Sequence, residues 1–185
     1  LRDRDALDAA LVRLVMEGTD SHLHSACLVR VVGEGDDRRC LVQACLERGA
    51  ARVSRDVLWT DWTTLPHVSE FPLRLQALAE GAMVHAANAA HRVVVPLQTP
   101  QGIWGLLELT GSAPLTPHSL ELLDGILQTY HNVVGLLDYG ERDALTELLN
   151  RKTFDGAFFK ATAEQQRDEL PEGGERRHTH PDAGV

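Results

Sequence analysis

The apolar residues of this chain predict two antiparallel pairs of β-strands, and this pattern most restricts the fold. Residues 23–32 form one apolar run, and residues 40–46 form a second after a turn rich in glycine and aspartate. Two apolar runs around such a turn indicate a β-hairpin. Two further runs, residues 93–97 and 103–109, are joined by a short polar segment. The chain is therefore expected to build an antiparallel sheet.

Apolar residues at three- and four-residue spacing predict a helix on either side of this sheet region in the sequence. The first helix opens the chain and ends at Gly18, a natural helix stop. The second begins at Thr116 or Pro117, where caps and first-turn prolines belong. The apolar face of the first helix consists of Leu7, Leu11, Leu14 and Val15, and that of the second of Leu120, Leu123, Leu127, Tyr130, Val134 and Leu137.

The segment between the two strand pairs has a different character. Residues 53–70 show no clear period and are expected to cross the sheet as a long irregular excursion. A short helix is expected over residues 71–79, with Leu75 and Leu78 facing inward and Gly81 ending it.

The six apolar residues of the second helix, from Leu120 to Leu137, form a single stripe along it. Their steps alternate between three and four residues, which is typical of the seam of a coiled coil. We predict that this stripe holds a homodimer together. It covers fewer than three heptads, so packing within a single chain is the alternative.

Residues 143–154 carry a family resemblance, reading Asp-Ala-Leu-Thr-Glu-Leu-Leu-Asn-Arg-Lys-Thr-Phe. They resemble the opening motif of GGDEF domains, which are the catalytic domains of diguanylate cyclases. Glu147 stands where the family usually has glycine, and Lys152 where it usually has arginine. The matching residues are Asp143, Leu145, Thr146, Leu148, Asn150, Arg151 and Phe154.

The GGDEF resemblance implies that the parent protein joins two GTP molecules into cyclic di-GMP with Mg²⁺. That chemistry needs acidic metal ligands and a Gly-Gly turn. Residues 172–176 contain Gly-Gly, but they follow the opening motif too closely and lack flanking apolar strands. We therefore expect this chain not to be an enzyme, and to need no cofactor of its own. Residues 164–185 have few apolar residues and are expected to be disordered.

A second resemblance covers residues 5–137. Pro96-Leu97, followed by Gly102-x-Trp104-Gly105-x-Leu107-x-Leu109, is similar to the central strands of GAF domains. It implies an α+β fold: a GAF-like central antiparallel sheet of five or six strands flanked by helices, with a long C-terminal stalk helix. The expected division is a GAF-like domain at 1–137 with its stalk helix from 117, a truncated GGDEF start at 138–163, and a disordered tail at 164–185. A PAS domain is the main competing fold.

The GAF resemblance also implies a pocket for a small molecule between the sheet and the excursion. Trp59 and Trp62 are candidates for stacking faces, and Asp61 for an anchoring carboxylate. His85 and His91 flank the strand expected to form the pocket floor. The alternative is that Trp59 and Trp62 are packing anchors and that His85 and His91 are surface residues. The sequence does not identify the ligand.

Charge and cysteine content narrow the class of protein further. With 27 acidic and 18 basic residues the net charge is −9, which argues against a nucleic-acid-binding surface. The chain opens at Leu1 without a signal peptide, as an excised fragment would, and no apolar run approaches the ~20 residues of a membrane helix. Cys27, Cys40 and Cys45 are odd in number and lack metal-site spacing, so buried reduced thiols in a cytoplasmic protein are expected.

Three functions follow from these patterns. The first is the ligand-sensing and dimerisation region of a diguanylate cyclase. The second is a degenerate GAF domain that serves only for dimerisation. The third is an independent enzyme, such as the GAF-fold reductase of free methionine sulfoxide, which requires exposed, paired cysteines.

Overall fold

The computed structural model describes residues 2–19, 22–50, 52–56, 61–88, 90–100 and 102–141. The longer elements are α1 (Arg2–Gly18), β1 (Leu23–Val32), β2 (Arg39–Glu47), α2 (Pro72–Glu80), β3 (Val84–Ala87), β4 (His91–Thr99), β5 (Gly102–Gly111) and α3 (Pro117–Glu141). Three short 3₁₀ turns are η1 (Gly35–Asp37), η2 (Trp62–Thr64) and η3 (Val68–Glu70). The chain divides into two compact units, residues 1–137 and 138–185.

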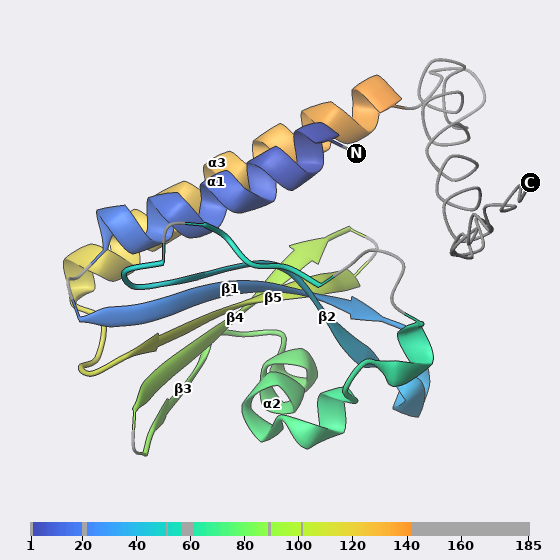
Figure 1. Cartoon of the computed structure of the whole chain (residues 1–185), viewed down its shortest axis with the longest axis horizontal. Helices are drawn as coiled ribbons and strands as arrows, with labels where there is room; N and C mark the ends of the chain where they lie inside the picture. The colour runs from blue at the N-terminus through green and yellow to red at the C-terminus, as the bar shows by residue number, and fades with distance from the viewer. Residues whose placement is uncertain are drawn as a thin grey trace, which may run out of the picture. The chain divides into compact units, whose positions relative to one another are not determined.

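The five strands of the described part form one antiparallel sheet in the order β2-β1-β5-β4-β3. Helices α1 and α3 lie side by side on one face of this sheet, and α2 lies on the other face (Figure 1). This arrangement confirms the predicted α+β fold, with both hairpin regions as expected. Among the described helices, none is long and apolar enough to cross a membrane.

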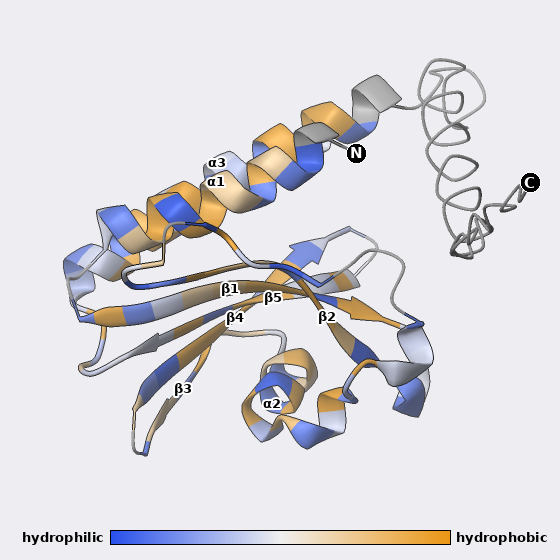
Figure 2. Cartoon of the chain, viewed as in Figure 1, coloured by the Kyte–Doolittle hydropathy of each residue, from blue (hydrophilic) through white to orange (hydrophobic). Residues whose placement is uncertain are grey.

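The larger core lies between the sheet and the pair α1 and α3, where Figure 2 shows hydrophobic residues on both helices and on the strands beneath them. Its centre is built from Leu11, Val12 and Val15 of α1 and Leu107 and Leu109 of β5, each at most 2% exposed. These residues sit at i, i+1 and i+4 on the helix and alternate on the strand, which are the spacings of one buried face of each element.

The six apolar residues of α3 from Leu120 to Leu137 are called the α3 stripe below. Its four central residues belong to this core, so the prediction that they hold a dimer together is wrong. Leu123 is 2% exposed, Leu127 8%, Tyr130 4% and Val134 9%, all within the chain's own core cluster. Leu120 and Leu137 are half-buried. The three-four spacing arose because the helix packs on its own sheet and on α1, which needs the same kind of apolar stripe as a coiled coil.

A buried polar contact ties α1 to α3. The Tyr130 hydroxyl donates to Oδ1 of Asp8 at 2.7 Å, and Asp8 is 6% exposed. Burial raises the pKa of Asp8, while the hydrogen bond from Tyr130 offsets part of this effect. At its other end α1 meets α3 through Gly18, where an added Cβ would lie 3.2 Å from the Leu122 side chain. The two helices therefore run antiparallel.

The smaller core lies between α2 and the opposite face of the sheet. It contains Val29, Val94 and Leu106 from the strands and Ala77 from α2. The helix spans Pro72–Glu80 and ends at Gly81 in the left-handed conformation, close to the predicted bounds. The expected inward position of Leu75 is wrong, since this side chain is 39% exposed and Ala77 takes the buried place.

Two glycines of β5, Gly105 and Gly102, stand where the backbone leaves no room for another residue or requires a glycine conformation. A Cβ at Gly105 would lie 2.9 Å from the backbone oxygen of Val29 in β1, closer than real contacts allow. Gly102 at the β4–β5 turn has a φ of 126°, which favours glycine. These are the close approach and the tight turn that the sequence pattern predicts.

The cysteines differ from the expectation of three reduced thiols. Cys27 and Cys45 face each other across β1 and β2 and are joined by a disulfide, whereas Cys40 is buried and free. The backbone of Cys45 bonds outward to Ser54 (2.7 and 2.8 Å), so Cys27 and Cys45 form a non-hydrogen-bonded pair. Such pairs bring side chains closest together. The register of β1 against β2 determines this pairing, so the cysteines no longer support a cytoplasmic location.

We predict that protein purified without reductant has one free thiol after unfolding, that of Cys40. Cys27→Ser should lower the free energy of unfolding by about 3 kcal/mol, because the bridge closes a loop with a sequence separation of 18 residues. Non-reducing peptide mass spectrometry and urea titration check both statements. Three alkylated cysteines in the native preparation would show that the pair is reduced.

Candidate functional site

A cavity of about 410 Å³ lies on the α2 face of the sheet, at the end where β3 turns into β4. The beginning of α2 forms one wall, and β4 and β5 form the floor. Its polar residues come from η3, α2, β4, β5 and the β3–β4 turn, and polar groups among apolar ones are typical of small-molecule sites. The lining residues are Glu70, Phe71, Pro72, Leu73, Arg74, Gln76, Ala86, Asn88, Ala90, Arg92 and Glu108.

The central feature of this cavity is an ion pair between α2 and β5. Nε of Arg74 donates to Oε2 of Glu108 at 2.7 Å, and the two side chains are 13% and 16% exposed. The Arg74 guanidinium also lies 4.0 Å from the centre of the Phe71 ring. Burial alone would lower the pKa of Arg74, but the charge and hydrogen bond of Glu108 raise it. Arg74 therefore stays charged and holds Glu108 in place.

A second arginine gives the cavity its accessible positive charge. Arg92 is exposed, and strand alternation places it on the same face of β4 as Val94. Glu108 pairs directly with Val94, so Arg92 and Glu108 project from the same face of the sheet. With Phe71 and Leu73 beside them, these groups can accommodate a small molecule that has an anionic group and an apolar portion.

The predicted residues of the excursion do not meet in this cavity. Asp61 is exposed, and its carboxylate accepts from the backbone N–H (3.0 Å) and the hydroxyl (2.7 Å) of Thr63. These hydrogen bonds lower the pKa of Asp61 and cap η2. Trp62 is 59% exposed. Trp59 lies outside the described residues. In the described part of the excursion, Asp61 thus has a local structural role.

His85 and His91 project from the other face of the sheet. His85 pairs with Val93, whose side chain belongs to the α1–α3 core. His91 lies two residues before Val93 on β4 and so shares its face. Neither lines the cavity beside α2, because a shift of one residue along a strand reverses the face. No group of three or more His, Cys, Asp or Glu in the described ranges could hold a metal ion.

The charged residues that line the cavity, Arg74, Arg92 and Glu108, were not predicted from the sequence. Glu108 carried a usable signal, since it is the single charged residue in the apolar run 103–109. A charge in such a run is rarely buried without a partner. Arg74 gave no comparable signal, because an arginine in a short amphipathic helix ordinarily faces solvent.

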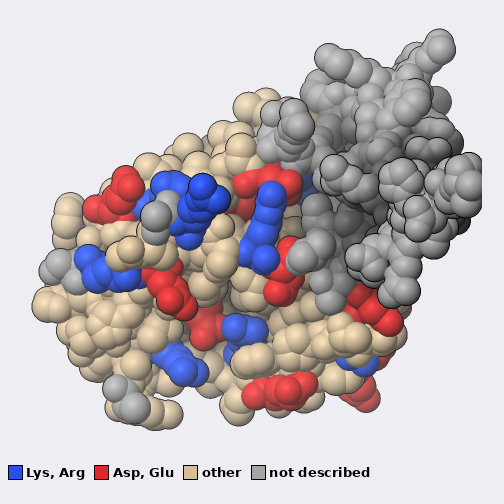
Figure 3. All heavy atoms as spheres, viewed as in Figure 1, with Lys and Arg blue, Asp and Glu red and all other residues tan. Residues whose placement is uncertain are grey.

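The surface charge is mixed. Figure 3 shows acidic and basic side chains interspersed on the face in view, without a broad basic field.

Comparison with solved structures identifies the fold. No family model matches the sequence, and no curated protein matches it. The GAF domain/HD domain protein from Geobacter sulfurreducens is similar with a TM-score of 0.53 and 12% identity, over 72% of this chain and 93% of that chain. The GAF domain of an Acinetobacter phosphoenolpyruvate-protein phosphotransferase gives 0.50 and 15%, over 71% and 81%. The cyanobacteriochrome receptor PixJ gives 0.50 and 15%, over 74% and 97%. The chain therefore has the fold of GAF domains.

Proposed function

We propose that this chain is the ligand-sensing and dimerisation region of a diguanylate cyclase, located in the cytoplasm and acting as a homodimer. Its GAF-fold domain binds a small molecule and controls cyclic di-GMP synthesis by a GGDEF domain that follows. The observation that carries the sensory part is the cavity beside α2, with its fixed Arg74–Glu108 pair and exposed Arg92.

The chemistry of the cavity favours sensing over catalysis. Arg74 and Glu108 satisfy each other, and the one free cysteine of the described part, Cys40, is buried. Burial raises the pKa of the Cys40 thiol, which disfavours the reactive thiolate. Such a cavity can bind and release a ligand, but its described residues offer no activated nucleophile.

The link to a cyclase is supported by the order of the chain. Helix α3 runs without interruption through Gly140 to Glu141, and the GGDEF-like motif begins at Asp143. The motif itself, from Asp143 to Phe154, lies outside the described residues. GTP and Mg²⁺ would be bound by the catalytic part of the parent protein. A continuous helix that leads into a catalytic domain can pass on a rotation or displacement, because the reaction requires two active sites to face each other.

This mechanism predicts that cyclase activity depends on the phase of α3. An α-helix turns by about 100° per residue, so one alanine inserted after Asp138 should misalign the catalytic domains. Seven alanines make almost two turns and should nearly restore their orientation. In the full-length cyclase, we expect synthesis of cyclic di-GMP to fall by about tenfold or more with one residue and to recover with seven. Equal activity of both variants would indicate a flexible joint and contradict control through α3.

A further inference from the structure

The disulfide between Cys27 and Cys45 lies on the α2 face of the sheet, in one row with the ion pair of the cavity. Cys27 packs against the smaller core. Its neighbour on β5 is Glu108, and the neighbour of Cys45 on the outer side is Ser54 of the excursion. The row therefore runs from the excursion through the disulfide to the carboxylate that Arg74 holds.

The sulfur bridge joins β1 to β2 at a position where the two backbones do not bond to each other. The N–H and C=O of Cys45 bond to Ser54 and point away from β1. An antiparallel ladder alternates between pairs with and without backbone hydrogen bonds, so Cys27 and Cys45 share none. The backbone groups of Cys27 point instead to β5, where Glu108 is its partner. The bridge is thus the direct link in the row between β2 and β1.

A bulge makes the end of β2 a short separate segment. The register of β1 against β2 shifts between Leu28 and Val29, so residues 44–47 pair as a block apart from the rest of β2. This block carries the excursion, because Cys45 and Ser54 exchange two backbone hydrogen bonds of 2.7 and 2.8 Å. Opening the bridge is therefore expected to loosen the block and the excursion while the rest of the sheet stays paired.

A reductant can reach this bond. Cys27 and Cys45 are both half-buried and β2 is an edge strand, whereas the free Cys40 is only 1% exposed. In the cytoplasm, the location in the proposed function, disulfides are usually transient and act in redox sensing or catalysis. Accessible disulfides are also more labile than enclosed structural ones. The position of the pair favours a bond that opens and closes over a permanent cross-link.

We propose that Cys27 and Cys45 form a reversible thiol–disulfide site whose reductant is a dithiol. A thiolate of the dithiol attacks one sulfur of the bridge and forms a mixed disulfide, and the other cysteine leaves as a thiolate and takes up a proton. The second thiol of the reductant then displaces the remaining cysteine. Two electrons and two protons pass to the protein, and the dithiol becomes a disulfide. A small or protein disulfide closes the bridge again by the reverse steps.

The state of this site sets how firmly β2 and the excursion are held to the row that contains Glu108. In the bridged form the row is continuous from Ser54 to the Arg74–Glu108 pair, and in the dithiol form it is interrupted at Cys27. The redox state then acts on the cavity beside α2, a step that rests on the sensory role in the proposed function. The site itself needs an electron donor and no bound ligand.

Hydrogen exchange of the whole chain, followed by mass spectrometry, tests the site. Treatment of the folded protein with dithiothreitol should raise the free thiols, counted after unfolding, from the one of Cys40 to all three cysteines. Amide exchange in residues 44–56 should become about tenfold faster or more. Exchange in α3 should stay unchanged. Removal of the reductant and addition of glutathione disulfide should reverse both changes.

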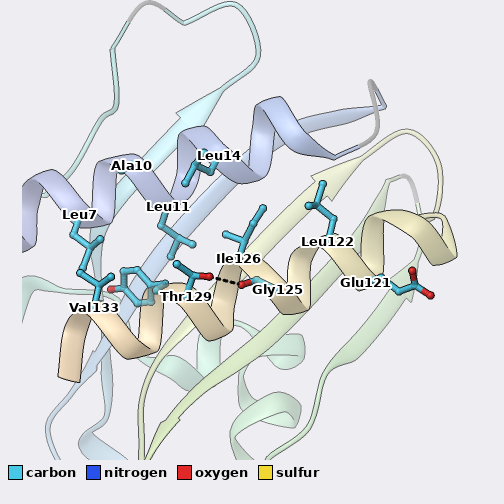
Figure 4. A pocket seen from close by; sticks show the side chains of 11 residues that line it. Leu7, Ala10, Leu11, Leu14, Glu121, Leu122, Gly125, Ile126, Thr129 and Val133 are labelled. Atoms are coloured by element: carbon cyan, nitrogen blue, oxygen red, sulfur yellow. Dashed lines mark hydrogen bonds between the residues drawn. The ribbon is translucent and has the colours of Figure 1, made fainter. Parts of the chain in front are cut away.

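Three variants separate the site from a general loss of stability. Cys27→Ser/Cys45→Ser should exchange fast with or without reductant. Cys40→Ala removes the remaining thiol and should keep the full response. Ile126→Ala lies in the groove between α1 and α3 on the other side of the sheet (Figure 4). It weakens the packing against the larger core, leaves the row intact and should keep the response.

A pair that stays bridged in excess dithiothreitol, or that glutathione disulfide cannot close, would overturn the reversible site. Reduction that leaves exchange in residues 44–56 unchanged would overturn the hold on β2 and the excursion. Equally faster exchange in α3 would show a cross-link that supports the whole fold, and would also contradict the proposal.

The same treatments of the full-length cyclase separate this inference from the proposed function. We expect the rate of cyclic di-GMP synthesis to change at least about threefold on reduction of the wild type and not in Cys27→Ser/Cys45→Ser. A rate that is indifferent to reduction, with the exchange response intact, would overturn the coupling to the cavity and leave the thiol–disulfide site standing.

Discussion

Leu123→Ala should lower the free energy of unfolding by about 3–4 kcal/mol, because it leaves a cavity in the core between α3 and the sheet. Leu123 is 2% exposed and packs within the larger core cluster. Leu75→Ala on α2 is the matched control. Its side chain is 39% exposed, so the same substitution should cost less than about 1 kcal/mol. Urea titration followed by circular dichroism measures both changes.

The same pair of variants decides the role of the α3 stripe. If the stripe is core, Leu123→Ala destabilises the fold and leaves the association constant of the folded dimer nearly unchanged. A variant that dissociates the dimer but unfolds at the wild-type urea concentration would return the stripe to the dimer interface.

Glu108→Leu should cost about 3–5 kcal/mol, because it leaves the Arg74 guanidinium buried without its partner. The pair is well shielded, with Nε and Oε2 2.7 Å apart and both side chains at most 16% exposed. The double variant Arg74→Met/Glu108→Leu should recover most of the loss, since it removes the unpaired charge and keeps the volume apolar. Unfolding free energies of the wild type, both single variants and the double variant form a complete cycle.

A zero coupling energy in this cycle would contradict a buried, mutually dependent pair. It would mean that Arg74 can reach solvent or another acceptor when Glu108 is lost. The cavity would then be more flexible than its geometry indicates, and Arg74 would be available to contact a ligand directly.

The fold could be read from the sequence because local patterns determine it. The runs in β1, β2, β4 and β5, the glycines at 81, 102 and 105, and the spacing on α1 and α3 each reflect a local requirement of strand, turn or helix. The packing partner of the α3 stripe, in contrast, is not determined by a local pattern. An apolar face specifies that a helix packs, but not whether its partner belongs to the same chain.

The site could not be read in the same way, because it depends on register and on contacts between distant residues. Arg74 and Glu108 are 34 residues apart and meet only after α2 packs on β5. His85 and His91 were predicted to flank the strand that forms the pocket floor. The alternation of side chains along β3 and β4 places both on the opposite face of the sheet from Arg92. The Cys27–Cys45 pair likewise depends on the register of β1 against β2.

Control of the cyclase requires the cavity beside α2 to act as the sensory site, and two neighbouring positions on β3 test this role. Ala86 lines the cavity, whereas His85 is exposed and lies on the other face of the strand. Ala86→Trp fills the cavity, and His85→Trp adds the same bulk outside it. The measurement is the rate of cyclic di-GMP synthesis from GTP and Mg²⁺ by the full-length cyclase carrying each change. We predict a change of at least about fivefold for Ala86→Trp and a wild-type rate for His85→Trp. Wild-type rates for both variants would contradict control of the cyclase through this cavity.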